Sequence, residues 1–381
     1  ALGLPGLGYE ATATRINLCS GGFSSFTETS LQARRKRSEP EDLHIKLFYR
    51  LRALDGMVGE AMELTGRLIR EADLGDLKRI ADLYLEMRNE YRSAIIPSGS
   101  SFAALRAERG LSPSEAIEEL WRGISQVDFL NSLGAKLADD EGNPDDGGLV
   151  DGGPADGQTF REGDPAAQPG AALDPERQAL ATRIATALAG IRERVIRREG
   201  LSVNLTAQGP ALQSGLQAVS VWASTLPSVD IDDSAVEIRA GVDPEGRPVP
   251  RLEACTLASK VAFVATALAG SLIGDKAYSQ ESLQAHLLRT SYLWEHIRMK
   301  GGAYGASAGN DGMSGLFTFS SYRDPRISAT LEVYRAALAH FAASPVEARE
   351  LLLAKIGSVA KEIRPLVPGE AGLVSFRRWL Y

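Results

Sequence analysis

The sequence predicts an α+β protein with two related domains, each an antiparallel sheet with helices packed on one face. Short segments of alternating polarity come in pairs with turn residues between them, as in β-hairpins, and long segments of helical periodicity follow. A regular β-α-β alternation, which would indicate a doubly wound parallel sheet, is not present in the sequence.

An acidic segment, residues 139–174, divides the chain. It holds ten acidic residues, one basic residue, eight glycines and four prolines, so it has little to bury, and we expect a disordered linker. The two domains are therefore predicted at 1–138 and 175–381. The linker also accounts for the net charge of −7, because the rest of the chain has 39 acidic and 41 basic residues. We expect no nucleic-acid partner and, without an apolar run of about 18 residues, no membrane span.

The first domain is expected to contain one helix, a hairpin and four further helices. The basic run Arg34–Arg37 is predicted to form the exposed tip of the hairpin, with binding of an acidic partner as the alternative. Serine is a favourable N-cap and proline a favourable first helical residue, so Ser112-Pro113 is expected to open the last of these helices. The predicted helices are 9–18, 57–72, 77–96, 102–109 and one from 112, and the predicted strands are 24–32 and 44–53.

The second domain is expected to follow the same pattern, beginning with a helix capped by Asp174-Pro175. A turn at Asn310-Asp311-Gly312 predicts a hairpin between two strands. The last helix is predicted to end near Arg364, and we expect the chain to stop before a further terminal helix. The predicted helices are 175–198, 211–225, 280–300, one from 324–325 to 341, and 345–364, and the predicted strands are 201–207, 260–268, 303–308 and 316–321.

The cysteines and histidines limit the chemistry of this chain. Cys19 and Cys255 are expected to be buried thiols, and two cysteines exclude a disulfide-dense scaffold. No two of the four histidines stand three or four residues apart, and neither H-E-x-x-H nor H-x-x-E-H occurs. We therefore expect no metal site within this chain.

The most informative segment is IRMKGGAYG, residues 297–305. Arg298 is expected at the end of a helix, Gly301 and Gly302 in a tight turn, and Tyr304 on the following strand. The guanidinium and the phenol could converge as hydrogen-bond donors to a peptide carbonyl or an oxyanion. The alternatives are a purely structural arginine and tyrosine, or a phosphate-binding loop, although such a loop follows a strand and opens a helix.

The second motif is SYRDP, residues 321–325, at the end of a strand. Asp324 is a good N-cap and Pro325 a good first helical residue, so we expect both to support the turn into the next helix. Contact of Tyr322 or Arg323 with a ligand is the alternative.

Together the two motifs resemble the presequence-protease branch of the pitrilysin/insulinase metallopeptidase family, which carries near-identical strings in its C-terminal half. The tract from Ile96 to Leu133 also resembles the family in order, so the similarity covers nearly all of the chain except the linker. The resemblance implies a chamber of four α+β domains that degrades short unstructured peptides. It also implies that the N-terminal half holds the zinc, through H-x-x-E-H, and that the C-terminal half holds no metal.

For this chain the resemblance implies that Arg298 and Tyr304 bind the substrate backbone and act in catalysis, with Gly301, Gly302, Asp324 and Pro325 as structural supports. It implies zinc in the intact enzyme, peptide substrates, and a missing N-terminal half or a catalytic subunit as partner. We expect a C-terminal fragment that is inactive alone, or alternatively a noncatalytic peptide-binding or scaffold subunit. The expected compartment is the bacterial cytoplasm, with the periplasm as the alternative.

Overall fold

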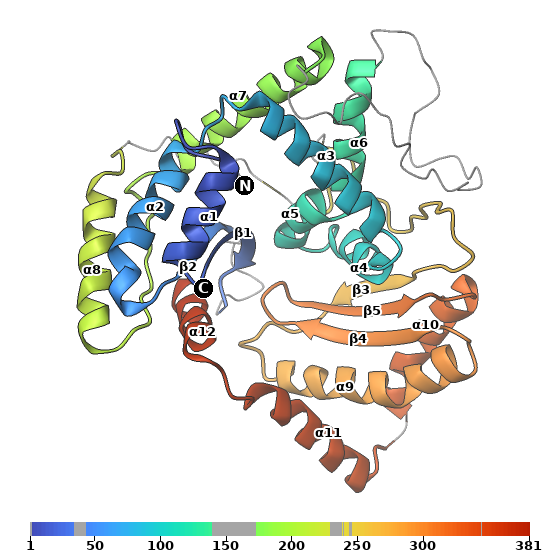
Figure 1. Cartoon of the computed structure of the whole chain (residues 1–381). Coiled ribbons are helices and arrows are strands. Elements are labelled where there is room, and N and C mark those ends of the chain that lie inside the picture. Colours follow the sequence, from blue (N-terminus) through green and yellow to red (C-terminus); the bar gives the residue numbers. More distant parts are fainter. Residues whose placement is uncertain are drawn as a thin grey trace.

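The computed structural model describes residues 2–33, 43–138, 173–228, 238, 240–243, 246–343 and 345–381. It confirms the α+β class, with two small antiparallel sheets among many helices (Figure 1). The predicted hairpin tip Arg34–Arg37 and nearly all of the acidic linker lie outside the described residues. No helix in the described part of the chain is both long enough and apolar enough to cross a membrane.

The first part of the chain follows the predicted order. Strands β1 (Gly22–Leu31) and β2 (Leu43–Arg52) pair antiparallel, in a register that runs from Gly22 opposite Arg52 to Leu31 opposite Leu43. Helix α6 was not predicted as a separate element. It is separated from α5 by extended backbone at Gly123, where a Cβ atom would lie 2.5 Å from the carbonyl oxygen of Glu119. The helices are α1 (Tyr9–Cys19), η1 (Asp55–Met57), α2 (Val58–Glu71), α3 (Leu77–Ala94), α4 (Gly99–Glu108), α5 (Pro113–Arg122) and α6 (Ile124–Ala138).

The second part contains a three-stranded antiparallel sheet in the order β3-β5-β4. Helix α7 begins as predicted, with the Asp174 carboxylate accepting from the Arg177 amide and Pro175 in the first turn. The elements are α7 (Pro175–Val195), α8 (Gly209–Ser224), β3 (Ala265–Ala269), α9 (Tyr278–Thr290), η4 (Trp294–Met299), β4 (Gly305–Asp311), β5 (Leu316–Tyr322), α10 (Ile327–Ala343), α11 (Ala348–Glu362) and α12 (Pro368–Leu380).

Four predicted elements differ from the structure. Residues 201–207 form no strand, and the Asn204 and Thr206 side chains pack at Gly372 of α12 instead of a strand partner. The strand predicted at 260–268 is confined to 265–269, and the one predicted at 303–308 begins at Gly305. The helix predicted at 280–300 is broken after Thr290. Helix α11 is not the last one, because α12 follows it.

Elements from the two predicted domains pack on one another (Figure 1). Ala181 of α7 shares a core with Ile80 and Ala81 of α3, and the Trp222 indole of α8 donates to the Gly66 carbonyl of α2 at 3.4 Å. Helix α12 returns to the first sheet, where the Ala33 amide donates to the Tyr381 carbonyl at 2.9 Å. The boundary at 139–174 remains a prediction, and α7, α8 and α12 contribute to the packing of the first part.

The core beneath the β3-β5-β4 sheet positions the motif residues. Alternate side chains of the sheet, including Phe317 and Phe319, pack against α9 and α10, where Leu288 and Tyr334 are buried. Burial of each such side chain stabilises the fold by roughly 1.5–3 kcal/mol. Helix α4 contacts the other face of the sheet, where the Thr318 hydroxyl donates to Glu108 at 2.6 Å.

Candidate functional site

Arg298 lies on a short π-helical segment, η4, and not at the end of a continuous α-helix. Helix α9 stops at Thr290, and the chain resumes helical geometry from Trp294, with the Lys300 amide donating to the Glu295 carbonyl at 2.9 Å. Ile297, 1% exposed, anchors the segment in the core, while Arg298 is exposed. Single π-turns of this kind are frequent at functional sites because they change which side chains face outward.

Both glycines of the motif are required by the turn that follows η4. A Cβ atom on Gly301 would lie 2.0 Å from the carbonyl oxygen of Ile297, and Gly302 has φ +82°, which favours glycine. The chain leaves the helix through hydrogen bonds from the Gly302 amide to Arg298 O at 3.0 Å and from the Ala303 amide to Ile297 O at 3.1 Å. The turn therefore fixes the backbone of Arg298 relative to the next strand.

Tyr304 directly precedes β4 rather than lying within it. Its amide donates to the Tyr322 carbonyl at 3.0 Å, so its backbone is held at the end of the β4–β5 ladder. Its side chain is 68% exposed, and its ring meets the Tyr322 ring edge-on with centroids 5.8 Å apart. Within the described ranges, neither the Arg298 nor the Tyr304 side chain makes a hydrogen bond or ion pair.

The phosphate-loop alternative disagrees with this geometry. The amides of Gly302, Ala303 and Tyr304 donate to carbonyl oxygens of the protein, so they are not directed at an anion. The turn also closes a helical segment and leads into a strand, which is the reverse of a phosphate-binding loop.

The SYRDP motif closes the site from the neighbouring strand. Asp324 is buried, and its carboxylate accepts from the Arg326 amide at 2.9 Å and from the Thr330 hydroxyl at 2.6 Å. Helix α10 begins at Ile327, so Asp324 acts before the helix and Pro325 is not its first residue, contrary to the predicted cap. The Arg326 guanidinium donates to the Lys300 carbonyl at 2.6 Å, which joins this turn to the end of η4.

The described residues do not fit a zinc site. No group of three histidine, cysteine, aspartate or glutamate side chains in that part of the chain could hold a metal ion. His296 and His340 both stack on the Tyr292 ring, with centroids 4.2 and 4.8 Å away, and His296 also contacts the Tyr292 carbonyl. These rings line a cavity of about 480 Å³ that adjoins η4, with Trp294 at its edge.

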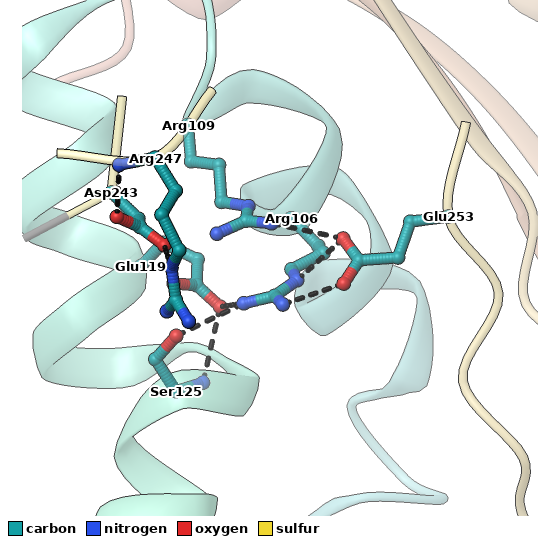
Figure 2. A network of polar contacts seen from close by, with 7 residues as sticks. All are labelled: Arg106, Arg109, Glu119, Ser125, Asp243, Arg247 and Glu253. Atoms are coloured by element: carbon teal, nitrogen blue, oxygen red, sulfur yellow. Dashed lines mark hydrogen bonds and ion pairs between the residues drawn. The ribbon is translucent and has the colours of Figure 1, made fainter. Parts of the chain in front are cut away.

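A polar network that sequence reasoning did not find joins α4, α5 and α6 to the segment before β3 (Figure 2). The Arg106 guanidinium donates to Glu119 at 2.8 Å and, in two bonds of 2.6 and 2.8 Å, to Glu253. Glu119 is 1% exposed and also accepts from the Ser125 amide at 3.1 Å. The hydrogen bonds from Arg106 lower the pKa of Glu253. Arg106 and Glu253 are 147 residues apart, so no local pattern predicts the contact.

The two cysteines differ in environment. Cys19 is buried as predicted, whereas Cys255 is exposed, so the prediction of a buried thiol was wrong there. Residue 255 lies in the irregular segment that the Arg106 network holds at Glu253, and its residue exposure reflects that this segment runs over the surface.

Comparison with known proteins gives two family matches. Residues 1–133 match a family described as peptidase-associated, and residues 253–381 match the "PreP C-terminal domain". The motif residues Arg298, Tyr304 and Asp324 lie in the second match. The Arg106 network links the two matched regions, since Arg106 and Glu119 lie in the first and Glu253 is the first residue of the second.

Several relatives are named presequence proteases. The chain is 26% identical over 368 residues to "Presequence protease 1, chloroplastic/mitochondrial" of Arabidopsis thaliana, which covers 95% of the chain and 29% of that protein. It is 24% identical to "Presequence protease, mitochondrial" of Danio rerio, over 97% of the chain and 33% of the relative. The protein of the same name from Yarrowia lipolytica is 24% identical over 74% of the chain and 24% of its own length. The chain thus spans about a third of the length of such relatives or less.

Proposed function

Because this chain belongs to the presequence-protease-like branch of the pitrilysin family, and corresponds to its C-terminal half, we propose that it forms the metal-free, substrate-binding part of a zinc endopeptidase. Its substrates would be short unstructured peptides. Arg298 and Tyr304 would hold the peptide backbone near the bond that is cleaved.

The observation that carries the proposal is the pair of exposed donors at the two ends of one glycine turn. Arg298 and Tyr304 have backbones fixed by hydrogen bonds, while their side chains have no polar partner among the described residues. A rigid backbone with an uncommitted donor is what preorganised binding of a carbonyl oxygen requires. Surface arginines that serve only the fold commonly have a carboxylate or carbonyl partner, as Arg326 has here.

In the proposed mechanism, the Arg298 guanidinium and the Tyr304 hydroxyl donate hydrogen bonds to carbonyl oxygens of the bound peptide. Donors that are already oriented lower the barrier most when the carbonyl oxygen gains negative charge as the bond is attacked. Tyr304 keeps its proton throughout and acts as a donor. The described residues offer no zinc site, so hydrolysis would need a metal-bearing part of the enzyme outside this chain.

The second candidate is a noncatalytic peptide-binding or scaffold subunit, which would share the fold and the donor pair. The reading frame upstream of Ala1 distinguishes the two. An in-frame H-x-x-E-H motif selects the peptidase, and a start codon immediately upstream selects the separate subunit.

The test of the proposed function is Tyr304→Phe in the polypeptide that also carries the metal site. Removal of one oxyanion donor typically lowers kcat by about 10²–10³-fold, and we expect a loss of this order with an unchanged Tm. Tyr9→Phe is the matched control, because Tyr9 is also exposed and lies on α1. Unchanged turnover in Tyr304→Phe would refute the catalytic role.

The chain alone is expected to have no peptidase activity and to bind no stoichiometric zinc. Incubation of the purified chain with an unstructured peptide, with and without a chelator, checks both points. Cleavage that the chelator abolishes would contradict the assignment.

A further inference from the structure

Strand β5 contains a β-bulge at the end that faces the candidate site. Along β3 and β5 the pairing is regular, and the Ser321 amide donates to the Val264 carbonyl at 2.8 Å. Two residues before Val264, Ala262 pairs with Asp324 through two hydrogen bonds of 2.8 Å. Three residues separate Ser321 from Asp324, so β5 carries one extra residue between these pairs.

Arg323 occupies this bulge in a conformation that favours glycine. Its φ is +50°, and within the described ranges it is the one non-glycine residue with positive φ. A non-glycine residue in this region costs roughly 1–2 kcal/mol. Bulges next to active sites commonly redirect a side chain, and strain of this kind is retained where it serves a function.

The bulge places Arg323 beside Tyr304. The Tyr304 amide approaches both the Tyr322 carbonyl at 3.0 Å and the Arg323 carbonyl at 3.4 Å. The Arg323 guanidinium lies 5.4 Å from the centroid of the Tyr322 ring, and this ring packs on Tyr304 and on Phe263. Arg323 itself is exposed.

No acidic side chain in the described part of the chain neutralises Arg323. The adjacent Asp324 is buried, and both of its oxygens accept from other groups. Glu295, on η4, pairs with Lys300 at 2.6 Å. Arg298 and Arg323 therefore leave this edge of the sheet positively charged, on a chain whose overall charge is −7.

We propose that Arg323 is a third peptide-binding residue of this site and that it binds a carboxylate of the peptide. A guanidinium matches a carboxylate in two parallel hydrogen bonds, which a backbone carbonyl cannot provide. The carboxylate is the C-terminus of the peptide or an acidic side chain. The inference rests on the proposed function, since it adds a contact to the surface formed by Arg298 and Tyr304.

The test measures fluorescence anisotropy of labelled, unstructured peptides with the full 381-residue chain. Three peptides share one neutral sequence: one ends in a free carboxylate, one in an amide, and one in an amide with a single internal glutamate. The unmodified chain should bind a carboxylate peptide about tenfold more tightly than the amide peptide. The peptide that shows the preference identifies the source of the carboxylate.

Arg323→Gly is the decisive variant, because glycine fits the bulge and removes only the side chain. We expect an equal or higher Tm together with loss of the carboxylate preference. Arg323→Lys keeps the charge without the fork and should retain part of the preference. Arg335→Ala, an exposed arginine on α10, should change neither quantity.

The outcomes separate this inference from the proposed function. Arg298→Ala should weaken all three peptides alike. If it does, but Arg323→Gly leaves the carboxylate preference intact, Arg323 is a structural residue and the inference is wrong. If the unmodified chain binds acid and amide peptides equally, the inference is also wrong. If no peptide binds at millimolar concentration, both proposals fail.

Discussion

Arg106→Ala is expected to destabilise the protein far more than loss of its exposed partner. The substitution leaves the Glu119 carboxylate, 1% exposed, with the Ser125 amide as its remaining donor. Removal of one member of a buried ion pair typically costs ~3–5 kcal/mol. Glu253 is 29% exposed on its side chain and keeps Arg109 at 3.1 Å, so Glu253→Gln should cost about 1 kcal/mol or less.

Urea unfolding followed by far-ultraviolet circular dichroism measures the two losses, and hydrogen–deuterium exchange locates them. Exchange should rise most in α5 and α6, which Arg106 connects through Glu119 and Ser125 (Figure 2). Equal losses below about 1 kcal/mol for Arg106→Ala and Glu253→Gln would show that the burial of Glu119 does not govern the energetics, and would refute the reasoning.

The double variant Arg106→Met with Glu119→Leu separates the unpaired charge from lost packing. Replacement of both members of a buried pair by apolar residues of similar volume is often close to neutral. We therefore expect the double variant to recover most of the stability that Arg106→Ala loses. Failure to recover would attribute the loss to packing of the arginine stem.

Three further predictions concern single residues. Burial, reinforced by Glu108, raises the pKa of Glu115 from 4.5 to about 8, so the folded protein keeps a proton that the unfolded chain releases. The free energy of unfolding should then fall by ~3–5 kcal/mol as the pH rises through this range, and Glu115→Gln should remove the fall in thermal scans. Gly301→Ala should cost about 2 kcal/mol or more, because its Cβ would lie 2.0 Å from a backbone oxygen, and peptide binding should be lost with it. Gly66→Ala, whose Cβ would meet the Trp222 ring at 2.4 Å, should loosen α8 by ~1–3 kcal/mol and change tryptophan fluorescence.

Local patterns predicted most helices and both hairpins because these elements depend on nearby residues. The β1–β2 hairpin and helices α2, α3 and α8 agree closely with the predicted ranges. The motif residues Arg298 and Tyr304 were also singled out from the sequence, because consecutive glycines mark a turn that brings flanking residues together. Their role in binding remains a prediction.

The features that were missed depend on distant contacts. Nothing in residues 291–300 interrupts the helical periodicity, so the π-helical segment η4 arises from how Leu293 and Ile297 fit into the core. The bulge at Arg323 arises from pairing with Ala262, about sixty residues earlier. The segment 201–207 has strand-like composition, but the neighbouring surface is helix α12 rather than a strand edge.

Partnership distinguishes the arginines of this chain better than exposure does. Arg106 satisfies two carboxylates and a serine hydroxyl, and Arg326 donates to a backbone carbonyl, so the fold accounts for both side chains. Arg298 and Arg323 lie on segments whose backbones are strongly constrained, yet the described protein offers their guanidinium groups no carboxylate. A constraint on the backbone is a cost to the fold that the side chain does not recover within it. The recovery is therefore expected from a bound peptide, and Arg323→Gly tests this directly because it removes the constraint and the ligand contact in one substitution.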